Sequence, residues 1–574
     1  MKALWKKGAA IVGSAGALAL LLAGCGAQSS TNSTTPGTTS TSAKPNEGGQ
    51  INLDFIQNIR DLDPALAYDT QSGEVVDQLY DQLVTWAPGG SSKVVPMVAK
   101  SWDVSKDGLT YTFHLRNDVK FWNGDPVTAQ SFITEFYRVL SPNMGSGGAG
   151  FFTDIVGAAD YNAGKSKTIS GLSASDKYTL VIHLVKPEPF LLDALTMNFI
   201  SAVDPKYIES VGNHQLYAKN PAFDSTKAMG SGPFELNTIN PNQIILTKNP
   251  NYWRTDSYGQ KLPYLDKVTI NISTNDVTDT EHFEQGQTAW IGWNFGGDGI
   301  PSDEYPTFMA NPKYKAMTST KVMNSVWYVG MNMKVGPTAN PLVRQAIMYG
   351  INKKAIIQLM NGRGQVANQP LPPGVPGYVK NLPADATYTY NPTKAKQLLK
   401  QAGYSTSHPL TIDYYDQNSP DSVKIDTAIQ AQLAKIGIKL NLHLTSWATF
   451  LDKAESGQAD MFWLGWIQDF PDASDFLNTL FNFPAEGAVN DSTNYNNPQV
   501  NAWLNDAEYS TNQAQRIQDY EKATIQIMKD APWDPMYYDV FTSAVQPWVH
   551  GFYIPDVQED PIEWVWLDKS HIQG

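Results

Sequence analysis

The sequence predicts a protein of several domains whose second half is α/β. Its 574 residues are three to four times the ~150 residues of an average domain. Hydrophobic residues make up 42% of the chain, enough to build several cores. Residues 410–415 and 438–444 are predicted strands on either side of a helix over 421–436 that ends at Gly437. A strand–helix–strand order favours parallel pairing, as in α/β folds.

The first half of the body carries two predicted strands with a helix between them. Residues 108–116 alternate apolar and polar side chains, and residues 177–185 repeat that alternation. This period of two is typical of half-buried strands. Between them, Thr128 can cap a helix. The apolar face of that helix is formed by Phe132, Ile133, Phe136, Tyr137 and Leu140.

Further elements follow in the second half. Two helices are predicted to begin at Asn340 and Asn391, because each of these residues is a good cap and is followed by proline. We also expect a short helix over 447–456, a strand over 461–465 and a long helix over 512–529.

Composition excludes several classes of function. There are 42 Lys and Arg against 56 Asp and Glu, which gives a net charge of -14 and argues against nucleic-acid binding. The single cysteine excludes a disulfide scaffold. The eight histidines form no H-E-x-x-H pair, and no G-x-S-x-G motif occurs. We therefore expect no metal, no cofactor and no catalytic centre.

The N-terminal residues indicate export. Three lysines precede an uncharged stretch over residues 9–23, and a Leu-Ala-Gly-Cys sequence ends at Cys25. This pattern predicts a signal peptide over 1–24, and its ending resembles the bacterial lipobox, in which the cysteine is acylated. Residues 25–47 are rich in Ser and Thr, so they are predicted to tether a lipid-modified Cys25 to a body that works in the aqueous phase. We expect the protein at the outer face of a bacterial cell membrane.

One segment has the composition of a binding site. The strand predicted over 461–465 runs into Trp463 and Trp466, and Asp469 then precedes a turn at Pro471. In α/β domains, ligands bind where strands end. Aromatic rings with one carboxylate suit a ligand that has an apolar part and a cationic amine. The alternative is that both Trp side chains belong to the core and Asp469 caps the next helix, and these residues alone leave the choice open.

Motifs distributed over the body, from about residue 48 to the C-terminus, resemble a known family. They include Asp-Leu-Asp-Pro-Ala over 61–65, Leu-Tyr-Asp-Gln-Leu over 79–83, Pro-Met-Val-Ala-Lys-Ser-Trp over 96–102, Gly-Ser-Gly-Pro-Phe over 230–234 and Asn-Pro-Asn-Tyr-Trp over 249–253. In this order they resemble the oligopeptide- and dipeptide-binding lipoproteins of ABC importers. These form the large two-lobed class, family five, of extracellular solute-binding proteins.

The resemblance implies a two-lobed, periplasmic-binding-protein-like α/β fold of the Venus-flytrap type with an additional inserted domain. Lobe I would be discontinuous, the inserted domain II would follow its first segment, and lobe III would be the α/β part. The chain would cross between lobes twice, as a hinge requires, and the lobes would close around a ligand. The implied boundaries are 48–88, 204–326 and 531–574 for lobe I, 89–203 for domain II and 327–530 for lobe III.

The resemblance also implies the residues of a binding site. In peptide-binding relatives the ligand lies extended between the lobes, and one Asp holds its α-ammonium group; Asp469 matches that residue. A buried ammonium needs such a charged partner. Further expected contacts are Gly465, Trp466, Trp447 and Trp463 on one lobe, and Tyr68, Asp69, Thr70 and Gln71 on the other.

The predicted function is that of a monomeric, non-enzymatic receptor. It would capture short peptides outside the cell and deliver them to the permease of an ABC transporter. Two alternatives are an oligosaccharide receptor with the same fold, since Trp-rich clefts can stack on sugar rings, and a cell-surface hydrolase that uses a pair of carboxylates.

Overall fold

The computed structural model describes residues 44–572 except 56–58, 91–92, 273–275, 293–299, 301–302, 406, 483–492, 556 and 558–560. For residues 276, 447, 448, 455 and 561 it describes the backbone only. Lys44–Gly574 form one compact unit, which is the subject of the following description.

The first sheet has four strands in the order β1-β10-β9-β8, with β1 parallel to β10 and the other pairs antiparallel. Side chains such as Leu53, Ile244 and Ile270 are buried in its core, and helix α1 (Thr70–Leu79) contacts β8. Its strands are β1 (Gln50–Phe55), β8 (Phe234–Asn240), β9 (Gln243–Lys248) and β10 (Lys267–Ile272).

The middle sheet is antiparallel, in the order β4-β5-β7-β6. The two strands predicted over 108–116 and 177–185 are confirmed as its neighbours β5 and β7. Helix α2 (Ala129–Val139) begins after Thr128, as predicted. The strands of this sheet are β4 (Ala99–Val104), β5 (Thr110–Leu115), β6 (Leu172–Asp176) and β7 (Thr179–His183), and a separate pair is formed by β2 (Val84–Trp86) and β3 (Val94–Pro96).

The large sheet has eight strands, and the predicted strand–helix–strand unit lies within it. Strands β15 and β16 pair in parallel and are connected by helix α12 (Pro420–Ala434), so the predicted parallel pairing is confirmed. The strands are β11 (Trp290–Ile291), β12 (Thr318–Val322), β13 (Ser325–Met331), β14 (Gly364–Val366), β15 (Leu410–Gln417), β16 (Ile438–Thr445), β17 (Met461–Ile467) and β18 (Trp533–Val545).

Strand β18 joins two parts of this sheet. Its first residues pair with β13 and β14, and its last residues pair with β12 and β11. Because β12 leads directly into β13, two long chain segments run side by side here. The predicted domain boundaries near residues 326 and 531 fall in and beside these segments, and the boundaries themselves stay a prediction.

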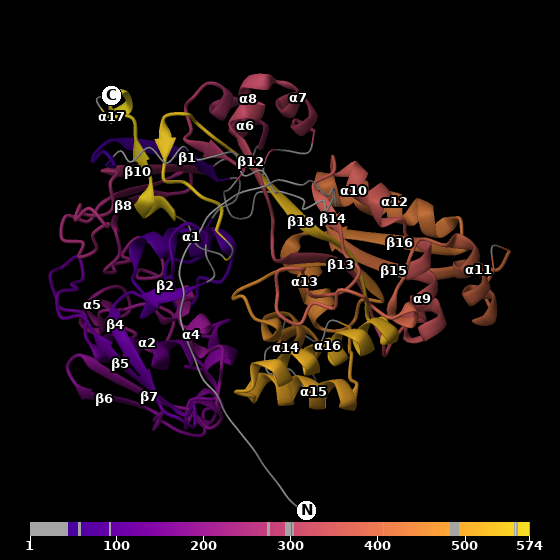
Figure 1. Cartoon of the computed structure of the whole chain (residues 1–574), viewed down its shortest axis with the longest axis horizontal. Coiled ribbons are helices and arrows are strands. Elements are labelled where there is room, and N and C mark those ends of the chain that lie inside the picture. Colours follow the sequence, from indigo (N-terminus) through magenta and orange to yellow (C-terminus); the bar gives the residue numbers. More distant parts are fainter. Residues whose placement is uncertain are drawn as a thin grey trace, which may run out of the picture. The chain divides into compact units, whose positions relative to one another are not determined.

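Helices α14, α15 and α16 pack against one another beside the large sheet (Figure 1). The predicted helices after Asn340 and Asn391 are confirmed as α9 and α11, both with these residues as N-caps. In the described part of the chain, the other helices are α3 (Ala158–Asn162), α4 (Leu191–Ala194), α5 (Pro205–Ser210), α6 (Asp276–Glu284), α7 (Tyr305–Ala310), α8 (Pro312–Ala316), α9 (Pro341–Gly350), α10 (Lys353–Leu359), α11 (Pro392–Gln401), α13 (Trp447–Glu455), α14 (Ala473–Phe481), α15 (Pro498–Tyr509), α16 (Gln513–Asp530), α17 (Lys569–Ile572) and five 3-10 turns.

A buried ion cluster fixes the segment before α1. Arg138 of α2 is fully buried, donates to Glu135 at 2.9 Å and is also paired with Asp63. Its guanidinium also donates to the backbone oxygen of Leu216 at 2.6 Å. Buried charges require such partners, and this cluster anchors the chain a few residues before Tyr68.

Candidate functional site

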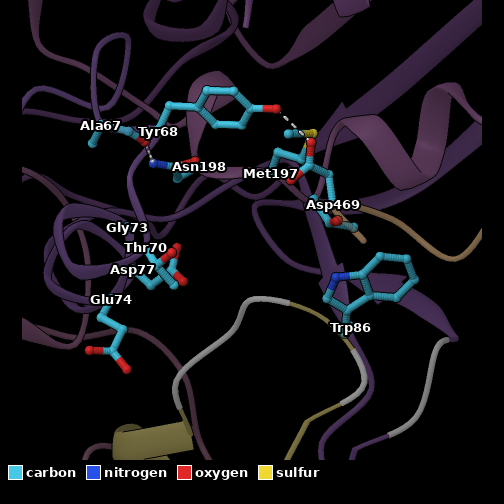
Figure 2. Close-up of a pocket in the computed structure, with 11 residues that line it drawn as sticks. Ala67, Tyr68, Thr70, Gly73, Glu74, Asp77, Trp86, Met197, Asn198 and Asp469 are labelled. Atoms are coloured by element: carbon cyan, nitrogen blue, oxygen red, sulfur yellow. Dashed lines mark hydrogen bonds between the residues drawn. The ribbon is translucent and has the colours of Figure 1, made fainter. Parts of the chain in front are cut away.

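Asp469 lies between the end of β17 and the start of α14. Asp472 is the N-cap of α14, because its side chain accepts a hydrogen bond from the backbone N–H of Ser474 at 2.9 Å. The alternative that Asp469 caps this helix is therefore wrong. The Oδ2 atom of Asp469 instead accepts a hydrogen bond from the Tyr68 hydroxyl at 2.8 Å (Figure 2).

The first turn of α14 holds Asp469 in place. Asp475 is fully buried, and its Oδ2 accepts hydrogen bonds from the backbone N–H of Asp469 at 3.0 Å and from the indole N–H of Trp466 at 3.2 Å. One carboxyl oxygen thus connects the end of β17 to α14.

The two carboxyl groups strongly affect each other. Burial raises the pKa of Asp469 above its ordinary value, and the hydrogen bond from Tyr68 opposes that rise. Burial also raises the pKa of Asp475, and the charge of Asp469 adds to this rise. Two buried neighbouring carboxyls disfavour a second negative charge. A cation against Asp469 would remove this penalty, so the pair is suited to a protonated amine.

The contact between Tyr68 and Asp469 borders a pocket of about 30 Å³. Figure 2 shows Asp469 across the pocket from Glu74 and Asp77. Among the described residues that line the pocket, these three are carboxylates and none is Lys, Arg or His. The described lining therefore carries three acidic side chains and no basic one. Its lining consists of Ala67, Tyr68, Thr70, Gly73, Glu74, Asp77, Trp86, Thr196, Met197, Asn198 and Asp469.

Sequence reasoning missed much of this lining. Thr70 was predicted, but Gly73, Glu74 and Asp77 were not, although they follow Thr70 at spacings of three, four and seven residues. These spacings place side chains on one face of a helix, so interpreting residues 70–79 as a helix would have found them. Trp86 and residues 196–198 carry no such signal, because only the tertiary fold brings them to the pocket.

The four residues predicted on the first lobe have different roles. Tyr68 and Thr70 line the pocket. Asp69 is the N-cap of α1 and accepts a hydrogen bond from the backbone N–H of Ser72 at 3.1 Å. Gln71 is buried in the first turn of α1 and is not part of the pocket lining described above.

The residues predicted on β17 also have different surroundings. Trp463 is 4% exposed and packs in the core against Trp327 and Tyr537, with ring centroids 6.1 and 6.0 Å away. The core alternative therefore describes Trp463, which the structure does not bring to the pocket. A Cβ on Gly465 would lie 2.9 Å from the Trp327 indole, so glycine leaves room for that ring. Trp466 is half-buried and is held by Asp475.

Two predicted residues lie outside the described part. Trp447 begins helix α13, but its side chain is not among the described ones. Cys25 precedes the described residues, as do the predicted signal peptide and most of the predicted tether.

Within the described part of the chain, no group of three or more His, Cys, Asp or Glu side chains could hold a metal ion. None of the helices in the same part combines the length and apolar character needed to span a bilayer.

The chain is similar to known bacterial binding proteins over most of its length. The family model for bacterial extracellular solute-binding proteins, family 5 middle, matches residues 93–487. Heme-binding protein A of Haemophilus influenzae is 30% identical over 552 residues, covering 93% of this chain and 95% of the relative. The oligopeptide-binding protein OppA of Bacillus subtilis is 28% identical, covering 89% and 91%. The periplasmic binding protein DppA of Helicobacter pylori, solved with the peptide STSA, has a TM-score of 0.77 at 28% identity, covering 91% and 99%.

The chain therefore belongs to the family-5 extracellular solute-binding proteins of bacteria. The family resemblance seen in the sequence is confirmed, and so is the two-lobed α/β fold of the periplasmic-binding-protein type.

Proposed function

We propose that this protein is a receptor that captures short peptides between its lobes, with the peptide N-terminus at Asp469, and passes them to the permease of an ABC transporter. The observation that carries the proposal is the buried Asp469 at the edge of the pocket, which is bonded only to the neutral Tyr68 hydroxyl among the hydrogen bonds described for its side chain. A peptide α-ammonium would supply the missing positive charge.

Two further points support a peptide. The names of the Bacillus subtilis and Helicobacter pylori relatives refer to oligopeptide or peptide binding. In addition, an extended peptide can be held through its backbone, which gives affinity for many sequences. The ligand would be returned intact, as expected of a receptor that is not an enzyme.

Other ligands fit the pocket less well. A heme, the ligand in the name of the Haemophilus influenzae relative, carries two propionate carboxylates that three pocket carboxylates would repel. An oligosaccharide could use Trp466 as a stacking surface and Asp469 as an acceptor for hydroxyl groups. Binding of an oligosaccharide in this way would not depend on a cationic group in the ligand.

Titration of ligand-free protein distinguishes these ligands. Random-sequence peptides of three to eight residues should change the tryptophan fluorescence, the same peptides with acetylated N-termini should bind much more weakly, and the bound peptide should be recovered uncleaved. Hemin and oligosaccharides should give no response. A response to hemin or sugar with none to peptides at millimolar concentration would contradict the proposal, and cleaved peptide would point to a hydrolase.

We further propose that the protein works as a monomer, anchored through an acylated Cys25 to the outer face of the cell membrane. The Ser- and Thr-rich residues 26–46 would keep the binding domain near the permease while leaving it free to turn. Replacing Cys25 with Ala should move the protein from the membrane fraction to the medium or periplasm and abolish labelling with a radioactive fatty acid. Unchanged membrane association would contradict the anchor.

A further inference from the structure

Phe470, the residue after Asp469, is inserted into the core of the middle-sheet region. It is 1% exposed, and its ring stacks on Phe190 with centroids 5.4 Å apart and planes at 7°. It also meets Phe151 edge-on at 6.0 Å. These two partners belong to the predicted inserted domain, whereas Phe470 follows β17 of the large sheet.

Asp469 and Phe470 are neighbours in the chain but contact different parts of the molecule. Asp469 is bonded to Tyr68 before α1, and Phe470 fills an aromatic socket formed by Phe151 and Phe190. Burial of a Phe ring is favourable, so this contact stabilises the arrangement in which the two regions touch. If the lobes separate, the ring has to leave the socket.

The charged groups around this contact come from both sides. Asp154 and Glu188, from the same region as the socket residues, interact with Glu508 and Tyr509 of α15, and Lys186 lies over the Tyr509 ring at 3.9 Å. Burial is the main cause that raises the pKa of Glu508 to about 7, and the charge of Asp154 adds to it, while hydrogen bonds and Lys186 oppose it. Burial also raises the pKa of Glu188, with Asp154 and Glu508 adding to the rise.

Asp193, three residues after Phe190, interacts with Asp472, which lies two residues after Phe470 and is ion-paired with Arg516 at 2.9 Å. Burial raises the pKa of Asp193 to about 7, and the charge of Asp472 adds to it, while Arg516 lowers it. The nearby phenols are Tyr111 and Tyr520. Among the described residues the contact therefore collects five carboxyl groups, Asp154, Glu188, Asp193, Asp472 and Glu508, and two cations, Lys186 and Arg516.

We propose that this contact is a proton-dependent latch, in which Phe470 holds the cleft closed and the surrounding carboxyl groups must take up protons as it closes. Opening would return these groups to water, where they ionise freely. The latch rests on the proposed function in one respect only: the proposed function identifies the latched state as the state that retains ligand.

The size of the effect follows from linkage. A carboxyl with a pKa of about 7 when latched and an ordinary value of about 4.3 when solvated raises the ratio of closed to open protein about tenfold between pH 8 and pH 6. Asp193 acts in the same direction. Acidification therefore favours closure, and neutral or alkaline medium favours opening.

The test measures closure in protein stripped of ligand. Spin labels are attached to cysteines at the exposed positions Lys165 and Lys396 in the full chain carrying Cys25→Ser, and pulsed electron paramagnetic resonance gives the closed and open populations at pH 6 and pH 8. The variants are Glu508→Gln, whose amide imitates the protonated acid, and Asp506→Asn, an exposed carboxyl on the same helix.

The closed-to-open ratio of the unmodified latch should rise at least about tenfold from pH 8 to pH 6. Glu508→Gln should have a higher closed-to-open ratio than the wild-type protein at pH 8, and its increase from pH 8 to pH 6 should be about tenfold smaller. Asp506→Asn should show the same increase as the wild-type protein. Asp469 adds its own proton dependence, which both variants retain, so the difference between them isolates Glu508.

Phe470 is tested in the same way. Phe470→Ala should lower the closed population at both pH values, and Phe470→Leu should lower it less. The latch would be overturned if the closed-to-open ratio of Glu508→Gln rose from pH 8 to pH 6 as much as that of Asp506→Asn. It would also be overturned if folded Phe470→Ala had the same closed population as the wild-type protein. No peptide enters this experiment, so a failure of the latch and a failure of peptide binding are separate results. The Glu508→Gln result decides the proposal even where Phe470→Ala does not fold.

Discussion

The carboxyl group of Asp469 is surrounded by groups that are neutral or negative. Tyr68 donates a neutral hydroxyl, Asp475 lies directly behind, and Glu74 and Asp77 line the same pocket. An ionised carboxylate in such a place is costly unless a cation joins it. At the scale of residues, the site is therefore completed by the charge of its ligand.

Asp475 offers a test of how Asp469 is positioned. Asp475→Ala should weaken peptide binding by ~1–2 kcal/mol, because it removes the acceptor for the Asp469 backbone and the Trp466 indole. Asp475→Asn keeps an acceptor oxygen and should restore most of the affinity, as measured by isothermal titration calorimetry. Equal losses in both variants would contradict a positioning role.

The sequence identified some residues and not others for physical reasons. Asp469 could be predicted because it follows a strand with aromatic residues and matches a family position. Asp475 could not, because its contact depends on how the turn at Pro471 brings α14 back beneath β17. Asp69 was expected to contact ligand, but a residue just before a helix also makes a good cap, and this is its observed contact.

At the scale of elements, β17 is buried on both faces. Met461 and Trp463 enter one core of the large sheet, while Phe462 and Leu464 enter the other. Gly465 then lies beneath the Trp327 ring of β13. The strand therefore presents Trp466 at its end, and Asp469 two residues beyond it, from a tightly packed base.

This packing predicts different outcomes for two glycines. Gly465→Ala should destabilise the fold by ~1–3 kcal/mol, because the new Cβ meets the Trp327 indole at 2.9 Å. Gly73→Ala, inside α1 with nothing within 4 Å of a new Cβ, should stabilise it by up to ~1 kcal/mol through helix propensity. Urea unfolding measures both, and equal effects would contradict the packing argument.

Elements with strong local signals could be predicted, and pairings between distant segments could not. The starts of α9 and α11 carry an Asn cap followed by Pro, and these predictions are confirmed. The alternation in β5 and β7 was equally clear. Strand β18 pairs with β11, β12, β13 and β14, and its sequence carries no information on these partners because hydrophobic patterning does not encode register between remote strands.

At the scale of the whole molecule, buried carboxyl pairs make stability depend on pH. Asp416 of β15 and Asp426 of α12 are almost fully buried, and the two carboxyl groups influence each other's protonation. Burial raises the pKa of both groups, and the charge of Asp416 adds to the rise in Asp426. A carboxyl with a raised pKa stabilises the fold below its unfolded pKa, and this contribution is lost as pH rises through the folded pKa.

The free energy of unfolding should therefore be larger at pH 5 than at pH 8. Asp426→Asn should raise it by ~1–3 kcal/mol at pH 8, since the amide is neutral and can donate to Asp416, and by less than ~1 kcal/mol at pH 5. Urea titrations at the two pH values measure this. A destabilised variant at pH 8, or the same gain at both pH values, would contradict the raised pKa of this carboxyl pair.

The organisation of the whole molecule was predictable only through the family motifs. Periodicity revealed the α/β unit around α12, but it could not show that Tyr68 and Asp469, 401 residues apart, form one hydrogen bond. Nor could it show Phe470 in the socket of Phe151 and Phe190. Such contacts depend on the packing of complete domains.

The central claim is that Asp469 holds the α-ammonium group of a peptide. Calorimetric titration of wild-type protein and Asp469→Asn, each with one peptide in its free and N-acetylated forms, tests it most directly. The substitution should cost at least ~2 kcal/mol with the free amine and less than ~0.5 kcal/mol with the acetylated peptide. An equal cost with both peptides, or no cost with the free amine, would contradict the claim.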